Sequence, residues 1–139
     1  MDKDEARLKQ HETMIEKHRE ANRVQHIKKL VANARAIITN QIGIPLGVLK
    51  MDNIMTWIRN IRPLTEIDIE IFSEYMRQAS GLPIGTERLQ YNKDYLKQQD
   101  VILDELTSNY KDRIIDKCFE IIEKFSNKEE SQTTDAQQQ

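Results

Sequence analysis

Apolar residues in the last third of the chain recur at intervals of three, four or seven positions, the spacing of one face of an α-helix. The stretch from Asn92 to Phe125 contains neither proline nor glycine, so no residue in it interrupts a helix. The expected buried face comprises Leu96, Leu103, Leu106, Tyr110, Ile114, Cys118, Ile121 and Phe125. Further apolar residues widen this face, which predicts that more than one other element covers it. They are Ile102, Ile115, Phe119 and Ile122.

Three shorter stretches upstream show the same helical spacing, and turn-forming residues separate them. The four expected helices span residues 24–42, 46–61, 67–79 and 93–125. Gly43 and Pro45 interrupt the pattern after the first stretch, and Pro63 ends the second. Gly81 follows the third where a left-handed cap is wanted, and Asn92 is placed to cap the long helix. Short connections of this kind favour antiparallel neighbours.

Two residues occur once each, and their spacing predicts a core position for both. Trp57 falls beside the apolar stripe of the second helix and is expected to anchor the core, with its indole N–H at an edge. Cys118 lies in the apolar face of the last helix and is interpreted as a small buried hydrophobe. A catalytic thiol would need solvent access and a neighbour that lowers its pKa, and the three histidines lie elsewhere, on the first helix.

The two ends of the chain are polar. Residues 1–23 predict a helical arm, in which Glu5 and Lys9 have the spacing of an ion pair. This arm is either a solvated helix or a linker or coiled-coil arm. The heptad positions of a coiled coil would be Leu8, His11, Ile15, His18 and Asn22. Residues 126–139 contain no aliphatic residue larger than Ala136, which predicts a disordered tail.

The composition favours a small all-α domain. Hydrophobic residues make up 38% of the chain and charged residues 32%, which fits a modest core with a charged outside. Four glycines and three prolines are too few for the many turns of a strand-rich fold. We therefore expect a four-helix bundle-like domain over residues 24–125, with a long polar N-terminal helical extension and a long C-terminal helix.

No stretch of the sequence approaches the roughly 18 consecutive apolar residues of a membrane span. The N-terminal residues are polar and mixed in charge, unlike a signal peptide. A membrane is therefore expected as a partner only if an N-terminal anchor is missing from this chain. The location stays open between cytoplasmic and membrane-tethered.

Residue types that carry catalysis or bind metals do not form a recognisable motif. His11, His18 and His26 all lie on the first helix, and the Glu-x-x-His pair of a di-metal bundle does not occur. The segments GIPLG and GLPIG lack the Lys-Ser/Thr of a phosphate-binding loop. We expect no catalytic residue, no cofactor, no metal and no small-molecule substrate, and hence no enzyme.

Residues 71–95 fit the outline of a helix-turn-helix, which is a DNA-binding motif. Small Ala79 precedes a glycine-containing turn and a second short helical segment. The side chains expected to face bases or phosphates are Arg88, Gln90, Asn92 and Lys93. Gly85 weakens the second helix, and the net charge of −2 does not favour phosphate contacts. Nucleic acid is therefore a possible but disfavoured partner.

The chain also carries an ordered set of short motifs. They are Arg35-Ala36-Ile37, Gln41, Leu46-Gly47, Leu49-Lys50-Met51, Phe72, Tyr75, Leu82-Pro83, Arg88, Tyr110-Lys111-Asp112 and Cys118. In this order, over most of residues 25–125, they resemble a small family of uncharacterised proteobacterial helical proteins, known as a domain of unknown function. The resemblance implies an N-terminally membrane-anchored protein with a polar helix as its stalk, although this chain lacks the anchor. It implies no activity and no catalytic residues.

Together these features favour a non-enzymatic protein-interaction or scaffolding module, which binds a protein partner or a second copy of itself. The expected interaction or loop-anchoring residues are Leu82, Pro83, Ile84 and Arg88. We expect Arg88 to pair with a carboxylate of the last helix, such as Asp94 or Asp104. Two alternatives remain: DNA binding through residues 71–95, and an immunity-type inhibitor of a toxin, which would have the same size and mild acidity.

Overall fold

The chain folds into helices over the part that the structure describes. The computed structural model describes residues 2–137, with side chains as far as Ser126. Its elements are α1 (Lys3–Ile38), α2 (Ile44–Ile61), α3 (Glu70–Gln78), the 3-10 helix η1 (Gly85–Gln90) and α4 (Lys93–Gln137). No strand occurs among these residues. The prediction of an all-α fold with a long N-terminal and a long C-terminal helix is confirmed.

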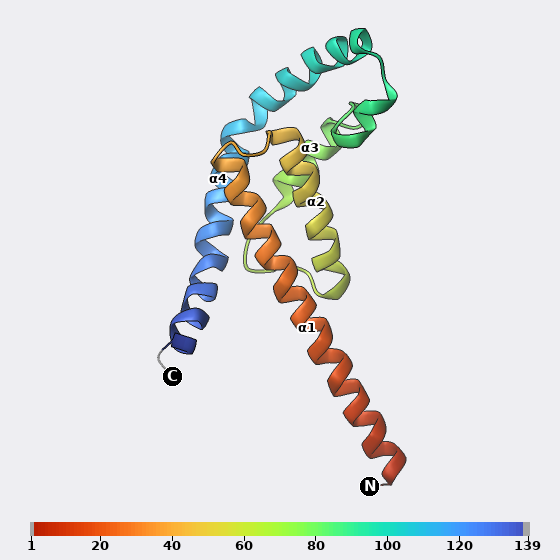
Figure 1. Ribbon diagram of the computed structural model, residues 1–139, viewed down its shortest axis with the longest axis vertical. Helices are drawn as coiled ribbons and strands as arrows, with labels where there is room; N and C mark the ends of the chain where they lie inside the picture. The colour runs from red at the N-terminus through yellow and green to blue at the C-terminus, as the bar shows by residue number, and fades with distance from the viewer. Residues whose placement is uncertain (1, 138–139) are drawn as a thin grey trace.

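The two long helices form the frame of the molecule. α1 packs against both α2 and α4, and α3 contacts α2 and α4 (Figure 1). The first half of α1 projects beyond the other helices as a free arm, drawn in red at the bottom of Figure 1. The long C-terminal helix is thus covered by more than one element, as the width of its apolar face predicts.

Helical spacing identified most of the core. The stripe of α2 is buried at Val48, Met51, Met55 and Ile58. The predicted face of α4 is buried at Leu103, Tyr110, Ile114, Cys118, Ile121 and Phe125. The expectation for the wider face of α4 is only partly correct, because Ile102 and Phe119 keep 53% and 55% of their surface exposed. The covering helices bury a narrower face than the apolar pattern indicates.

Trp57 does not anchor the core, contrary to the sequence-based expectation. It lies on the outer edge of α2 with 62% of its surface exposed, while Met55 and Ile58 beside it are buried. One face of the indole stacks on the imidazole of His26 from α1, with ring centroids 5.9 Å apart and an interplanar angle of 24°. The spacing predicted the buried stripe of α2 correctly, but the direction in which α1 meets α2 leaves Trp57 beside the buried interface.

α1 and α2 approach closely at Gly47. A Cβ built on Gly47 would lie 2.6 Å from Cγ1 of Ile37, so only glycine fits at this crossing. The side-chain amide of Asn33 donates a hydrogen bond of 2.8 Å to the Gly47 carbonyl and ties the two helices together. The connection between them turns at Asn40, which has a φ of 59°.

The helix boundaries agree with prediction at Ile61 and Lys93 and differ by one to four residues at four of the other ends. α3 begins at Glu70 rather than at residue 67. The Glu70 backbone amide donates a hydrogen bond of 3.0 Å to the Asp68 carboxylate. Ile67 and Ile69 lie in the preceding loop and pack against the core from there. Asn92 accepts a hydrogen bond from the Tyr95 amide at 2.8 Å, so the predicted cap of α4 is confirmed. Gly81 has the expected left-handed conformation, with a φ of 85°, but it lies in the turn after α3, whose C-cap is Ala79.

The arm joins the body at Arg23. Its guanidinium is buried and donates hydrogen bonds to the carbonyls of Arg62, at 3.2 Å, and Pro63, at 3.5 Å. One turn earlier, Arg19 reaches the Ile61 carbonyl at 3.4 Å, and Glu20 pairs with Arg62 at 2.9 Å. These contacts cover the C-terminal end of α2, where backbone carbonyls lack helical partners.

The predicted disordered tail falls largely outside the described side chains. The backbone of α4 continues to Gln137, and Ser126 is the last residue whose side chain is described. Residues 138–139 lie outside the described residues. Disorder over residues 126–139 therefore stays a prediction.

Candidate functional site

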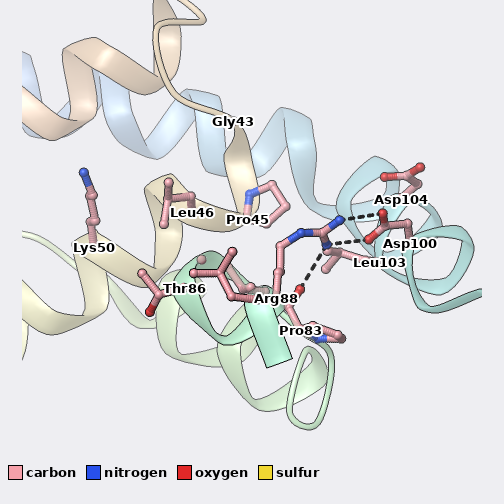
Figure 2. Close-up of a pocket in the computed structure, with 13 residues that line it drawn as sticks. Gly43, Pro45, Leu46, Lys50, Pro83, Thr86, Arg88, Asp100, Leu103 and Asp104 are labelled. Atoms are coloured by element: carbon pink, nitrogen blue, oxygen red, sulfur yellow. Dashed lines mark hydrogen bonds and ion pairs between the residues drawn. The ribbon is translucent and has the colours of Figure 1, made fainter. Parts of the chain in front are cut away.

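A surface trough of about 740 Å³ lies between the start of α2, η1 and the first turns of α4, and is called the α2–α4 groove below. Residues from three distant parts of the sequence line it (Figure 2). They are Gly43, Pro45, Leu46, Lys50, Pro83, Ile84, Gly85, Thr86, Arg88, Leu89, Asp100, Leu103 and Asp104. The volume falls within the range of about 300–1,000 Å³ that is usual for ligand sites.

Residue types in the local sequence explain how two walls of the groove form, the start of α2 and the start of η1. Pro45 occupies the first turn of α2, where its missing N–H costs no hydrogen bond. Gly85 has a φ of 68°, and a Cβ there would meet Cδ1 of Leu46 at 3.4 Å and Cδ2 of Leu49 at 3.6 Å. Glycine thus allows η1 to begin against the side chains of α2.

Arg88 joins η1 to α4. Its guanidinium donates two hydrogen bonds to the Asp100 carboxylate, at 2.7 and 2.8 Å, and a third of 3.3 Å to the Pro83 carbonyl (Figure 2). The hydrogen bonds from Arg88 hold the pKa of Asp100 below its usual value, and those to Asp100 raise the pKa of Arg88. We call this ion pair the Arg88–Asp100 clasp.

The expectation of an ion pair between Arg88 and the last helix is confirmed, but neither Asp94 nor Asp104 is the partner. Asp100 takes that place, because the direction in which η1 meets α4 brings the guanidinium to the second turn of the helix. Asp104 lies one turn further along and contributes only a longer-range attraction that raises the pKa of Arg88. Sequence spacing alone does not give the angle between two elements.

The groove has one cation and one anion that are not engaged in ion pairs. Lys50 makes no ion pair or hydrogen bond, and neither does the carboxylate of Asp104, among the described residues. Figure 2 shows Lys50 and Asp104 on opposite sides of the groove, with Pro45, Leu46 and Leu103 between them. The groove therefore has an unpaired cation at one end and an unpaired anion at the other, with apolar side chains between them and the Arg88–Asp100 clasp beside Asp104.

The predicted loop residues do not form an exposed patch. Pro83 and Ile84 line the groove but are themselves buried, and Leu82 is half-buried against the core. The large apolar side chain that is exposed beside them is Leu89, with 87% of its surface in solvent. Sequence reasoning missed Leu89 because it is isolated in the polar segment Gly85–Gln90 and belongs to no periodic stripe.

Two of the four side chains that a helix-turn-helix would direct at DNA are engaged within the domain. Arg88 is held in the clasp, and Asn92 caps α4. The segment after the turn is the six-residue 3-10 helix η1 rather than an α-helix. These contacts do not favour the DNA-binding alternative, which stays a prediction.

A second set of polar contacts holds α3 against α4. The Thr107 hydroxyl donates to the Leu103 carbonyl at 2.7 Å, so the Tyr75 hydroxyl, 2.9 Å from Thr107 Oγ1, must be the donor to it. Such bonds from threonine to the preceding turn commonly bend helices, and Figure 1 shows α4 changing direction as its colour passes from cyan to blue. The Tyr110 hydroxyl donates to Glu74 at 2.8 Å, which raises the pKa of Tyr110.

Side chains that could bind a metal or act as a nucleophile are dispersed over the described part of the molecule. No three histidine, cysteine or acidic side chains gather to hold a metal ion among the residues that the structure describes. Cys118 is fully buried, and burial raises the pKa of its thiol to about 12. The expectation that Cys118 is a buried hydrophobe is confirmed.

None of the described helices combines the length and the apolar character that crossing a membrane requires. No protein-family model, curated protein or solved structure matches this chain. The resemblance to a proteobacterial family of unknown function therefore depends on the sequence motifs alone.

Proposed function

We propose that this chain is a non-enzymatic protein-interaction module, and that the α2–α4 groove docks a short segment of a partner protein. The observation that carries the proposal is the open trough of about 740 Å³ beside Leu89, which has 87% of its surface in solvent. Leu46 and Leu89 keep surface exposed along this trough, whereas Pro83, Ile84 and Leu103 line it but are themselves buried. A concave, mainly apolar trough with a few polar groups is the usual form of a binding site.

The charges of the groove specify the chemistry of the occupant. Lys50 at one end attracts an acidic residue, and Asp104 at the other attracts a basic residue. Between them, Leu46 and Leu89 bury apolar side chains of the partner. The segment that fits is one with apolar residues in its middle, an acidic residue on one side and a basic residue on the other. Complementary charges of this type determine orientation and specificity more than affinity.

A displayed library of random peptides tests this proposal. Selection on the wild-type chain should enrich peptides that share an apolar middle flanked by opposite charges. Peptides selected on Lys50→Glu should carry a basic residue where the wild-type peptides carry the acidic one. Peptides selected on Asp104→Lys should carry an acidic residue where the wild-type peptides carry the basic one. Each reversal should weaken binding of the wild-type peptides several-fold, because a charge at the rim of an interface contributes about 1 kcal/mol or less.

Lys9→Glu is the matched control, because it makes the same charge change on the exposed arm, away from the groove. It should keep the wild-type peptide preference. The proposal is wrong if selection yields no shared pattern, or if the charge preference is the same in wild type, Lys50→Glu and Asp104→Lys. Binding of duplex DNA that weakens with salt would favour the helix-turn-helix alternative instead.

A further inference from the structure

η1 forms one wall of the α2–α4 groove, yet none of its six residues is buried. The chain is anchored before it, where Pro83 and Ile84 are buried, and after it, where Asn92 caps α4. Between these points the ring contact is that of Tyr91, just after η1, with Tyr95 of α4 at 4.8 Å between centroids, and no apolar side chain of η1 itself is buried. Leu89, the largest apolar residue of η1, points into solvent.

Arg88 supplies the only side-chain hydrogen bonds that η1 makes to the described part of the chain. Two of them reach Asp100 on α4, and the third returns to the Pro83 carbonyl at the start of the wall. The Arg88 and Asp100 side chains are 35% and 36% exposed. An ion pair with this exposure is screened by water and salt, so even with two parallel hydrogen bonds it can open without unfolding of the domain.

We infer that η1 is a movable wall of the α2–α4 groove and that the Arg88–Asp100 clasp holds it in position. When the clasp is closed, it sets the width of the groove. When the clasp is open, η1 moves away and the groove admits a larger occupant. Segments with few buried contacts open locally at much lower cost than the whole domain unfolds, and binding loops are drawn from such segments. Arg88 is therefore a positioning residue, which holds η1 in place through its hydrogen bonds to Pro83 and Asp100.

The movement of the wall does not depend on the proposed function, whereas its effect on binding does. Hydrogen exchange of the backbone amides of residues 85–91 measures the movement directly. In Arg88→Gln and in Asp100→Asn these amides should exchange about 1.5 to 5 times faster than in wild type, the factor that corresponds to losing an exposed ion pair of roughly 0.2–1 kcal/mol. The amides of α1 and α2 should exchange at the wild-type rate.

Arg77→Gln is the matched control, because it removes the exposed ion pair between Arg77 and Glu70, whose atoms lie 3.1 Å apart on α3 and do not line the groove. It should leave exchange in residues 85–91 unchanged. The reversed pair, Arg88→Asp with Asp100→Arg, should restore part of the protection that either single charge reversal removes. Exchange in residues 85–91 that is the same in Arg88→Gln, Asp100→Asn and wild type would overturn the inference.

Binding is measured next, with the peptides selected on wild type. Arg88→Gln should change their affinity several-fold and should accept peptides with bulkier apolar residues than wild type accepts. If wild type selects no peptide, the proposed function fails, and the exchange experiment still decides whether the wall moves. Exchange can also accelerate while the peptide affinity and the size of the apolar residues accepted stay as in wild type. In that case the clasp does not set the width of the groove, and the inference is overturned.

Discussion

Cys118 has no exposed surface, and its environment decides its chemistry. Burial raises the pKa of the thiol to about 12, because a thiolate in apolar surroundings loses its hydration. The thiol is therefore protonated and shielded at neutral pH, which suits a packing role and not a nucleophile. At the surface, Arg88 shows the opposite case, where a charge is stabilised because a carboxylate lies within hydrogen-bonding distance.

We predict that Cys118 reacts with a thiol reagent such as DTNB only after the chain is unfolded. The raised pKa also predicts a pH dependence of stability. The unfolded thiol releases its proton near pH 8.5, whereas the folded thiol keeps it up to about 12. This contribution to stability is therefore complete below about pH 8.5 and is lost as the pH rises above it. At about pH 10 the loss should approach roughly 2 kcal/mol.

Urea unfolding of wild type and Cys118→Ala across this pH range measures the effect, because the difference between the two chains isolates the thiol from other titrating groups. Rapid DTNB reaction of the folded chain, or a difference that stays constant with pH, would show that the thiol is accessible or unperturbed.

At the scale of elements, the crossing of α1 and α2 depends on the absence of a side chain at Gly47. Ile37 occupies the space that a Cβ would need, and Asn33 bonds to the Gly47 carbonyl at the same level. The same crossing directs Trp57 into solvent and positions Pro45 and Leu46 at the groove. A local clash at Gly47 should therefore act on both stability and the groove.

We predict that Gly47→Ala lowers the free energy of unfolding by about 1–3 kcal/mol, even though alanine is the better helix former. The added Cβ would sit 2.6 Å from Ile37 Cγ1, so the Ile37 side chain or the two helices must shift. Chemical denaturation measures the change. Gly43→Ala is the control, because its nearest contact would be Pro45 Cδ at 4.0 Å, and it should cost less. Equal losses in both variants would contradict the close-approach explanation.

Spacing in the sequence predicted the elements well and their mutual orientation poorly. Helical periodicity located the buried stripes of α2 and α4, and residue type located the cap at Asn92 and the left-handed turn at Gly81. These features are local, and the chain within a few residues determines them. The exposure of Trp57 and the partner of Arg88 depend on the angle between two elements, which no local pattern encodes.

At the scale of the whole molecule, the groove was beyond prediction for the same reason. Pro45, Ile84 and Leu103 belong to three separate segments, and only the packing of α2, α4 and the loop before η1 brings them together. The sequence did direct attention to residues 82–88, where one wall lies. It did not indicate the contribution of α2, nor the charged ends at Lys50 and Asp104.

The arm provides a test of where the folded unit begins. A chain that starts at His18 should have the wild-type free energy of unfolding within about 0.5 kcal/mol, because the part of α1 before it projects beyond the other helices and its side chains are almost all exposed. A chain that starts at Val24, the predicted domain boundary, loses the buried Arg23 and should be about 1–3 kcal/mol less stable.

Urea denaturation compares the two truncated chains with the full one, and light scattering of all three tests self-association through the arm. Equal stability of the two truncated chains would show that Arg23 does not contribute to the fold. A full chain that is monomeric, like the truncated ones, would argue against self-association through the arm.

The central claim is that a partner segment binds in the α2–α4 groove. Its most direct test is an NMR titration of the uniformly nitrogen-15-labelled chain with a peptide selected on wild type. We predict that the amide shifts change around Leu46, Lys50, Thr86, Leu89 and Asp104, while the amide shifts of the arm and of the Trp57–His26 surface stay unchanged. Shift changes confined to the arm or to the Trp57–His26 surface would contradict it.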